Sequence, residues 1–413
     1  MRCRIWASVA ILRTPYSRAS ANHVPSPFRL YSTNDSWEPL RILFCGSDEF
    51  SSASLRALHA EHLRDPQSIA SIDVVHRPAK RVDRGLKTIR QGNRAPFPNV
   101  LPISGVAQEL NLPVHERDTF TGWEPPKPNG SSINLIVAVS FGLFIPPRIL
   151  GSAKYGGLNV HPSLLPQFRG AAPLQHTILQ GNKYTGVTLQ TLDPHAFDHG
   201  DIISQVPIRI PRPDKVTYQE LLELVTPEAA KLLTDGIRDR LFLDPPKTDQ
   251  PRTGPAPIHA HKILPEHRYI DPRRGMTMYI NRQYRALGRP WSYLWTGSEK
   301  KRVIFNHIEF YHFGEKSQTR ARLSADLNTI PFLPSKAPNG PELWYTPYFE
   351  DKGSIVIRTN ERHKGLRFKD IIVEGQESKK AADVLSSIGY KRGELRCIVW
   401  ALPEREPEKP QEI

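Results

Sequence analysis

The stretch that runs from Gly157 to Gly200 constrains the fold more than any other part of the chain. It opens with Gly157-Leu158-Asn159-Val160-His161, in which apolar and polar side chains alternate as they do along a β-strand. This alternation puts Asn159 and His161 on one face of the strand and the apolar residues on the other. Because open parallel sheets bind ligands at the carboxyl ends of their strands, this strand end is a candidate site.

The residues that follow predict a loop, a helix and a second strand. Pro162 and Pro166 end the first strand and stiffen the loop. A helix is predicted over residues 171–180, with Gly181 as its stop, and a strand is predicted over residues 186–192. The candidate site therefore lies between two strands of one sheet.

A loop after the second strand supplies acidic side chains. It carries Asp198, and Asp193 and Asp201 flank it. A single Asn or His near a strand end is most often a hydrogen-bonded structural residue. Asn159 and His161 therefore indicate a site only together with an acid, and all three aspartates are candidates for that acid.

The rest of the first 244 residues continues an α/β pattern. Strands are predicted over residues 40–45, 69–75, 133–139 and 201–210, and helices over residues 50–63, 103–110, 146–150 and 218–242. Residues 133–139 are almost continuously apolar, as strands of buried parallel sheets are. The G-x-G-x-x-G fingerprint does not follow the first strand, which argues against a nicotinamide cofactor.

Several short runs in this part of the chain, in this order, resemble the N-terminal domain of the folate-dependent formyltransferases. They are Asn159-Val160-His161, Ser163-Leu164-Leu165-Pro166, Arg169-Gly170-Ala171-Ala172-Pro173, Thr185-Gly186-Val187-Thr188 and Phe197-Asp198-His199-Gly200. The resemblance implies a Rossmann-like α/β formyltransferase domain over residues 40–244, followed by a small β-barrel of the oligonucleotide-binding (OB) type. It also implies that Asn159, His161 and Asp198 form the catalytic set.

The resemblance further implies 10-formyltetrahydrofolate as the co-substrate. In the family an aromatic-Gly turn and the loop after Asn-x-His lie against the folate. The matching residues are Phe141, Gly142, Ser163, Leu164, Leu165 and Pro166. No metal is expected, because the three cysteines are far apart and fit neither a zinc site nor a disulfide framework.

Formyl transfer to an amine has requirements that the catalytic set can meet. The amine attacks the formyl carbon, and the carbonyl oxygen becomes negative in a tetrahedral intermediate. A donor that meets this charge is worth roughly 10²–10³ in rate, and the Asn159 amide and the His161 imidazolium can both donate. Asp198 can orient His161 and favour its charged form, or it can take the proton of the amine through a water. Serine or cysteine nucleophiles lack support, because G-x-S-x-G is absent and Cys45 lies on a strand expected to be buried.

A basic loop over residues 77–94 and the net charge of +14 favour a polyanionic partner. Most charge runs are solvated surface, which is the alternative for this loop. However, Arg77-Pro78-Ala79-Lys80-Arg81 resembles the R-P-A-G-R loop of the methionyl-tRNA branch of the family. That resemblance implies contacts with the acceptor stem of initiator tRNA by Arg77, Lys80, Arg81, Arg84 and Lys87.

Residues 1–34 have the composition of a mitochondrial transit peptide, which predicts a matrix protein. They contain no acidic residue and carry Arg2, Arg4, Arg13, Arg18 and Arg29. A disordered N-terminal tail is the alternative. No apolar run approaches the roughly 18 residues that cross a membrane, so no membrane insertion is expected.

The C-terminal part of the chain predicts a linker and a second domain. Residues 245–257 hold five prolines and are typical of a linker. Short strands over residues 302–310, 354–358 and 371–374 predict a barrel-like, tRNA-binding domain over residues 258–400. Residues 311–350 are rich in proline and serine and are interpreted as an insertion. Residues 401–413 are predicted to be a disordered tail.

The resemblance therefore implies transfer of a formyl group from 10-formyltetrahydrofolate to the amino group of methionyl-initiator tRNA, by a monomer. Two alternatives remain open. One is a formyltransferase that acts on a nucleotide or sugar amine, which would leave the basic loop over residues 77–94 and the transit peptide without a purpose. The other is a non-catalytic mitochondrial RNA-binding factor on the same scaffold, against which the complete set of Asn159, His161 and Asp198 argues.

Overall fold

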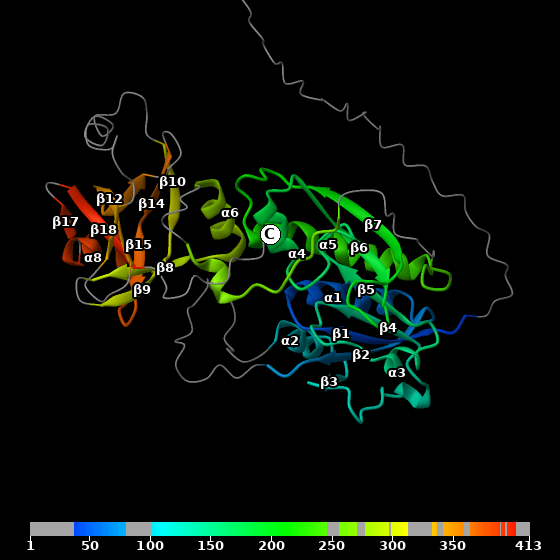
Figure 1. Cartoon of the computed structure of the whole chain (residues 1–413). Coiled ribbons are helices and arrows are strands. Elements are labelled where there is room, and N and C mark those ends of the chain that lie inside the picture. The colour runs from blue at the N-terminus through cyan, green and yellow to red at the C-terminus, as the bar shows by residue number, and fades with distance from the viewer. Residues whose placement is uncertain are drawn as a thin grey trace, which may run out of the picture. The chain divides into compact units, whose positions relative to one another are not determined.

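The structure is a computed structural model (Figure 1). It describes residues 37–79, 101–245, 256–270, 277–296, 299–312, 333–336, 342–358, 364–388, 390–392 and 395–401. The chain divides into two units, Met1–Glu38 and Pro39–Ile413. The predicted transit peptide, most of the linker and almost all of the predicted tail lie outside the described residues, so those boundaries stay predictions.

A seven-stranded sheet forms the first half of the larger unit, in the order β3-β2-β1-β4-β5-β6-β7. Its strands are β1 (Leu40–Gly46), β2 (Ile69–His76), β3 (Val114–Glu116), β4 (Leu135–Val139), β5 (Gly157–His161), β6 (Tyr184–Thr191) and β7 (Ile202–Arg209). The strands from β3 to β5 are parallel, which confirms the predicted α/β class. All five residues of β4 are buried, as their continuous apolar character predicts.

The last two strands of this sheet are antiparallel to their neighbours, which a prediction of a parallel-type sheet did not include. The connection from β5 to β6 contains only one short helix, α4 (Pro173–Gln180). Eight residues of helix rise about 12 Å. The chain accordingly enters β6 from the edge at which β5 ended, and Gly181 ends α4 in the predicted left-handed conformation (φ 71°).

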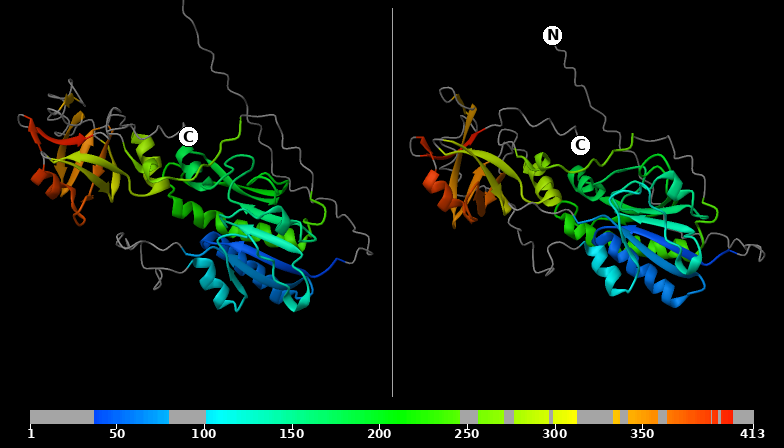
Figure 2. Two further views of the ribbon diagram at one scale, coloured as in Figure 1. Left: turned by 60° about the horizontal axis from the view of Figure 1, so that its bottom comes forward. Right: turned by 90° about the horizontal axis from the view of Figure 1, so that it is seen from below.

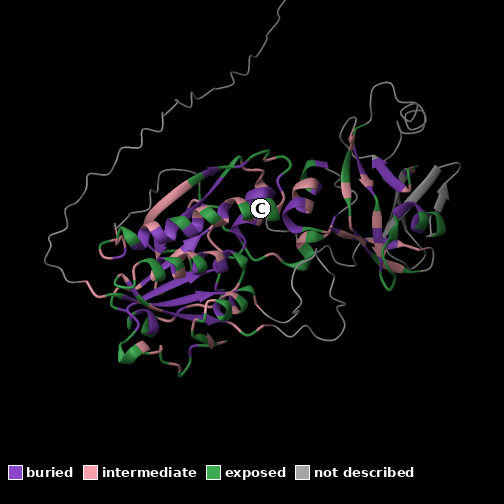
Figure 3. Cartoon of the chain, turned by 180° about the vertical axis from the view of Figure 1, so that it is seen from behind, coloured by how far each residue is buried: buried purple, intermediate pink, exposed green. Residues whose placement is uncertain are grey.

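Helices cover one face of this sheet, and a shorter helix with long loops covers the other (Figure 2). The helices are α1 (Glu49–Arg64), α2 (Pro102–Glu109), α3 (Pro147–Leu150) and α5 (Tyr218–Arg238), with a 3-10 turn, η1, at Pro128–Gly130. Asp48 caps α1 by accepting from the Ser51 amide at 2.9 Å, and Thr217 with Glu220 forms a capping box on α5. Figure 3 shows the buried residues of the strands between these layers in purple.

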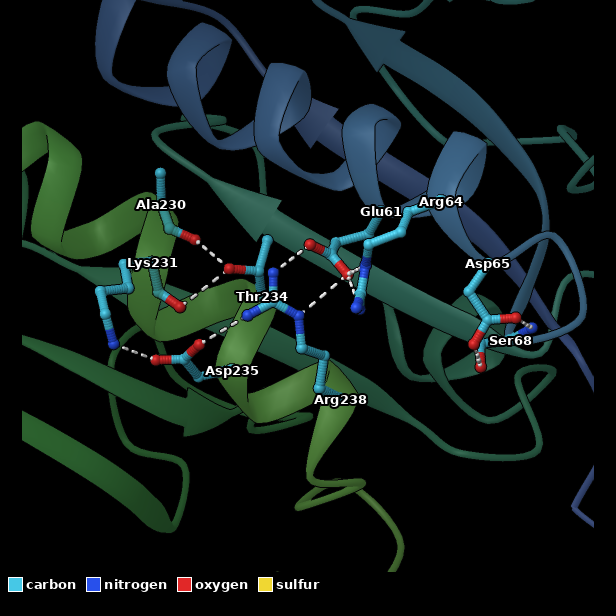
Figure 4. A network of polar contacts seen from close by, with 9 residues as sticks. All are labelled: Glu61, Arg64, Asp65, Ser68, Ala230, Lys231, Thr234, Asp235 and Arg238. Carbon is cyan, nitrogen blue, oxygen red and sulfur yellow. Dashed lines mark hydrogen bonds and ion pairs between the residues drawn. The ribbon is translucent and has the colours of Figure 1, made fainter.

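A buried carboxylate joins α1 to α5 (Figure 4). The Glu61 side chain is 10% exposed and accepts from Arg238 Nε at 2.9 Å and from Arg64 Nε at 3.0 Å. The hydrogen bond from Arg238, and then that from Arg64, lower the pKa of Glu61. A second, exposed ion pair on α5 joins Lys231 to Asp235, on the side of the helix that carries Arg238.

The second half of the larger unit is an antiparallel sheet, in the order β10-β14-β13-β12-β18-β8-β9-β15-β16, with β11 beside β12 and β17 beside β18. Its first strands are β8 (Trp291–Trp295), β9 (Lys300–Phe305), β10 (Ile308–His312), β11 (Leu333–Lys336), β12 (Glu342–Asp351) and β13 (Ser354–Arg358). The others are β14 (Lys364–Phe368), β15 (Asp370–Val373), β16 (Lys379–Lys380), β17 (Tyr390–Arg392) and β18 (Leu395–Ala401). The 3-10 turn η2 (Pro265–Arg268) and the helices α6 (Thr277–Leu287) and α8 (Ala381–Ile388) accompany them.

These strands form a small barrel, which confirms the predicted architecture. One strand was predicted over residues 302–310, but the chain breaks at Asn306 and His307 into β9 and β10, which pair with different neighbours. Because β10 begins the strand order and β9 lies near its other end, this bent stretch closes the sheet on itself. Phe305, Ile355 and Phe368 are among its buried core residues.

The interpretation of residues 311–350 as an insertion is wrong in part. β11 and β12 lie within this range, and β12 pairs with both β13 and β18. Pro347 lies in β12 and pairs with Cys397, so proline content was a misleading sign here. No described helix is long and apolar enough to cross a membrane.

Candidate active site

Strand β5 positions two of the predicted catalytic residues. It pairs with β4 through Ala138 and Asn159, and with β6 through Asn159 and Gln190 and through His161 and Thr188. Asn159 is half-buried and His161 is 5% exposed. Both lie on one face of the strand, as alternation predicts, and at its carboxyl end.

The Asp198 carboxylate joins these two residues. Its Oδ1 lies 3.3 Å from His161 Nδ1 and accepts from Asn159 Nδ2 at 3.1 Å. Its Oδ2 accepts from the Gly170 amide at 2.9 Å. The Asp198 side chain is 11% exposed and its backbone is left-handed (φ 59°). The structure therefore brings together the three residues that the sequence singles out.

The sequence left three aspartates as candidates for the catalytic acid. Of these, Asp198 is the one that contacts Asn159 and His161. Asp193 Oδ1 instead accepts from the amides of His195 and Ala196, at 2.7 and 2.8 Å. The Asp193 carboxylate thus closes a local turn. The Asp201 amide donates to Thr191 Oγ1 at 2.8 Å.

His161 is held from both sides. Its Nε2 lies 2.9 Å from the Phe168 carbonyl oxygen, which can only accept, so Nε2 carries a proton. Its Nδ1 faces the carboxylate of Asp198. The ring is thus fixed in orientation, and its Nε2 proton is engaged with the protein.

Three contacts at Asp198 were not predicted. Gln190 is 1% exposed, and its Nε2 donates to Asp198 Oδ1 at 3.4 Å. Arg169 Nε donates to the Asp198 carbonyl oxygen at 2.8 Å, and Gly170 supplies its amide. Burial lowers the pKa of Arg169, and the nearby Asp198 opposes that change. The available signal for Gln190 was the alternation in β6, which places Gln190 on the same face as Thr188 and apart from Val187 and Leu189.

The predicted folate-binding loop is held by two polar residues of neighbouring strands. Thr188 Oγ1 donates to the Ser163 carbonyl at 2.6 Å, and Gln205 Nε2 donates to the Leu165 carbonyl at 2.9 Å. Ser163 and Leu165 are buried, while Leu164 and Pro166 are half-buried. Leu164 fills the space at Gly186, where an added Cβ would lie 2.4 Å from its Cδ2.

The predicted aromatic-Gly turn follows β4. Phe141 is 5% exposed and packs on Phe120, with ring centroids 6.0 Å apart. Gly142 is exposed, has φ 69° and has no atom within 4 Å of an added Cβ. Its carbonyl accepts from Arg77 Nη1 at 3.2 Å. The folate contacts of these residues stay predictions.

Of the residues predicted to bind tRNA, only Arg77 is described, and it is half-buried. Lys80, Arg81, Arg84 and Lys87 lie outside the described residues. Burial raises the pKa of the Cys45 thiol, which makes this buried cysteine a poor nucleophile. Among the described residues, no three metal-binding side chains gather to hold an ion.

Comparisons with known proteins identify the family of the chain. A family profile described as formyl transferase matches residues 129–234. The mitochondrial methionyl-tRNA formyltransferase of Saccharomyces cerevisiae is 32% identical over 289 residues, which are 61% of this chain and 68% of the yeast protein. The human mitochondrial protein of that name is 32% identical over 64% of this chain and 61% of its own length. The methionyl-tRNA formyltransferase of Rickettsia bellii is 30% identical over 61% of this chain and 75% of its own. The chain belongs to the methionyl-tRNA formyltransferase family.

Proposed function

We propose that this chain transfers a formyl group from 10-formyltetrahydrofolate to the amino group of methionyl-initiator tRNA in the mitochondrion. The convergence of Asn159 and His161 on Asp198, inside the region that matches the formyl transferase family, carries the proposal. Relatives whose names give this acceptor, and in yeast and human this compartment, support it.

Asn159 is the first candidate for the donor to the developing oxyanion. One of its amide hydrogens is engaged by Asp198, which fixes the plane of the amide. Asn159 is also the only half-buried residue of β5, so a substrate can reach it. A fixed donor of this kind costs no reorganisation when charge appears on the formyl oxygen.

His161 supports that charge from a more enclosed position. Its Nε2 proton is directed to the Phe168 carbonyl, so direct donation to the formyl oxygen would require that hydrogen bond to break. We therefore assign His161 to holding Asp198 in place beside the reaction.

Asp198 is the acceptor for the proton that the attacking amine loses. Its carboxylate already accepts from Asn159 and the Gly170 amide. Its side chain is 11% exposed, so a water could reach it and carry the proton from the amine. The amine attacks the formyl carbon to form the tetrahedral intermediate and loses its proton to Asp198. The bond to N10 then breaks as N10 takes up that proton, which leaves the formylated amine and tetrahydrofolate.

Exposed and half-buried apolar residues in the loops after β4, β5 and β6 fit a flat, partly apolar donor such as a formylated pterin. Phe197 is 57% exposed and meets Phe144 edge to face, with ring centroids 5.2 Å apart. Leu164 and Pro166 are half-buried, and Gly142 has open space around it. These residues would bind and orient the donor, while the catalytic set acts on its formyl group.

We propose that the basic loop beyond Arg77 and the barrel hold the tRNA. On the barrel, the Arg302 guanidinium lies over the Trp291 ring at 4.6 Å, and Lys300 lies over Tyr293 at 4.8 Å. Arg302 is exposed and Lys300 is half-buried. Cations beside aromatic rings are typical of surfaces that contact nucleic acid. Residues 1–34 are proposed to direct import into the matrix; mass spectrometry that found them on the mature protein would contradict this.

The test uses purified chain, 10-formyltetrahydrofolate and three acceptors: methionyl-initiator tRNA, methionyl-elongator tRNA and an amino sugar nucleotide. We expect formyl-methionine on initiator tRNA and much slower transfer to the others. Preferred formylation of the sugar nucleotide would favour the small-amine alternative. Tight tRNA binding without formylation of any acceptor would favour a non-catalytic RNA-binding factor.

A further inference from the structure

The chain returns to the active site after the proline-rich linker. Ile258 to Ala260 runs beside the loop 167–172, with a parallel bridge between His259 and Arg169. The Phe168 amide donates to the Ile258 carbonyl and the Ala260 amide donates to the Arg169 carbonyl, both at 2.7 Å. The Ala172 amide donates to the Ala260 carbonyl at 3.2 Å.

A side chain adds a further hydrogen bond to this pairing. Gln167 Oε1 accepts from the Ile258 amide at 3.0 Å. The downstream chain is anchored again at α6, where Arg285 Nη1 donates to the Val216 carbonyl at 2.6 Å and Arg282 Nη1 donates to the Gln180 carbonyl at 3.2 Å. The chain beyond the linker is therefore held to the α/β half at Ile258 to Ala260 and again at α6.

The opposite side of the same loop holds the catalytic set. The Phe168 carbonyl faces His161 Nε2 at 2.9 Å, and the Gly170 amide donates to Asp198 Oδ2 at 2.9 Å. Two adjacent parts of one loop thus orient His161 and Asp198. Whatever fixes this loop also fixes the relative positions of His161 and Asp198.

The backbone of Ile258 to Ala260 lies very close to Gly170. A Cβ added at Gly170 would lie 2.5 Å from the Ala260 carbonyl oxygen and 3.1 Å from His259 Cε1. Gly170 also has φ +118°, a conformation that other residues rarely adopt. A glycine at this position of the motif therefore leaves room for the segment from beyond the linker.

We infer that Ile258 to Ala260 is a positioning element of the active site, which holds the loop 167–172 against His161 and Asp198. The inference rests on the proposed function, since it names what orients that site. It also moves the end of the catalytic unit from residue 244, where the sequence suggests it, to beyond Ala260.

The test compares Gln167→Ala with Gln167→Glu in the full-length protein. Alanine removes the acceptor for the Ile258 amide, whereas glutamate keeps an oxygen at that position. Ala260→Pro, which deletes the donor to the Arg169 carbonyl, is the stronger perturbation. Amide hydrogen exchange at Phe168 and Gly170 reports on the loop without reference to the reaction, and steady-state kinetics report on catalysis.

We expect Gln167→Ala to speed exchange at both amides and to lower kcat by roughly 2- to 10-fold, as loss of one hydrogen bond implies. KM for both substrates should be unchanged in Gln167→Ala. Gln167→Glu should have the kcat of the wild type. Ala260→Pro should lower kcat further than Gln167→Ala does. Faster exchange with unchanged kcat would overturn the inference, and so would unchanged exchange in both Gln167→Ala and Ala260→Pro. Failure of the wild-type protein to formylate any acceptor would instead overturn the proposed function.

Discussion

The two halves of the larger unit use charged and polar side chains in opposite ways. In the α/β half, the Asp198 carboxylate, whose side chain is only 11% exposed, lies within hydrogen-bonding or ion-pair distance of Asn159, His161 and Gly170. In the barrel, basic side chains lie nearer the surface: the Arg302 guanidinium lies over the Trp291 ring, and Lys369 meets Glu309 at 2.5 Å.

This difference predicts different responses to mutation. Buried polar groups that share partners act as a unit, so that removal of one disturbs the others. Exposed charges are screened by salt and contribute separately. Single substitutions near Asp198 should therefore have large effects, and single substitutions on the barrel should have small ones.

Asp198→Asn should have the largest effect. The substitution keeps the size of the side chain but removes its charge and one acceptor oxygen, while Asn159, His161 and Gly170 still require acceptors. We expect kcat to fall by about 10³-fold. Single-turnover kinetics with saturating donor would measure this fall, and a loss smaller than tenfold would show that Asp198 is not the centre of the set.

His161→Ala should reduce kcat by about 10²-fold and also reduce stability. The effect on stability is expected because His161 is buried and hydrogen-bonded to the Phe168 carbonyl. Leaving the Phe168 carbonyl unsatisfied should cost about 1–3 kcal/mol in the free energy of unfolding. Urea denaturation of His161→Ala, beside His161→Gln as a variant that can still donate, would separate the two effects.

Glu61→Gln should affect stability and leave catalysis unchanged, because Glu61 joins α1 to α5 away from the strand end. We expect a loss of about 1–3 kcal/mol at pH 7. Since hydrogen bonds from Arg238 and Arg64 lower the pKa of Glu61, the stabilisation is present above its unfolded value, near 4.3, and is lost as pH falls through the folded value. The difference in free energy of unfolding between the wild type and Glu61→Gln should therefore shrink as the pH falls.

Denaturation at several pH values would check this, with Lys231→Ala as the control for an exposed pair. The control should leave the free energy of unfolding almost unchanged, because exposed ion pairs contribute little to stability. A difference in free energy of unfolding that grows as the pH falls would contradict the role given to Arg238.

Arg302→Ala on the barrel should have the smallest effect. If its guanidinium contacts a phosphate, its loss should weaken tRNA binding a few-fold and reduce the salt slope of log K by roughly 0.7 to 0.9. Lys369→Ala is the matched control, because Lys369 already pairs with Glu309. Equal salt slopes for the two variants would remove Arg302 from the proposed tRNA surface.

Local patterns predicted the strand part of the site well. Asn159 and His161 lie on one face because alternation in a strand depends only on neighbouring residues, and the apolar run of β4 predicts its burial in the same way. The choice of Asp198 over Asp193 depended on a left-handed loop residue, which no local pattern indicates.

Contacts between distant parts of the chain could not be predicted. The pairing of Ile258 with Phe168 joins residues on either side of the linker, so a boundary drawn at the prolines was reasonable from sequence but missed it. The reversed direction of β6 depends on the short α4, and β12 has a proline in a segment that resembles an insertion. Composition reports local propensity, whereas these features arise from packing.

The central claim is that His161 and Asp198 act as one unit, and a double-mutant cycle tests it most directly. Single-turnover formyl transfer would be measured for His161→Ala, Asp198→Asn and the double variant. Residues that act as a unit are strongly non-additive, so the double variant should be about as slow as the slower single variant. If the two losses instead multiply in the double variant, the residues act independently and the account is contradicted.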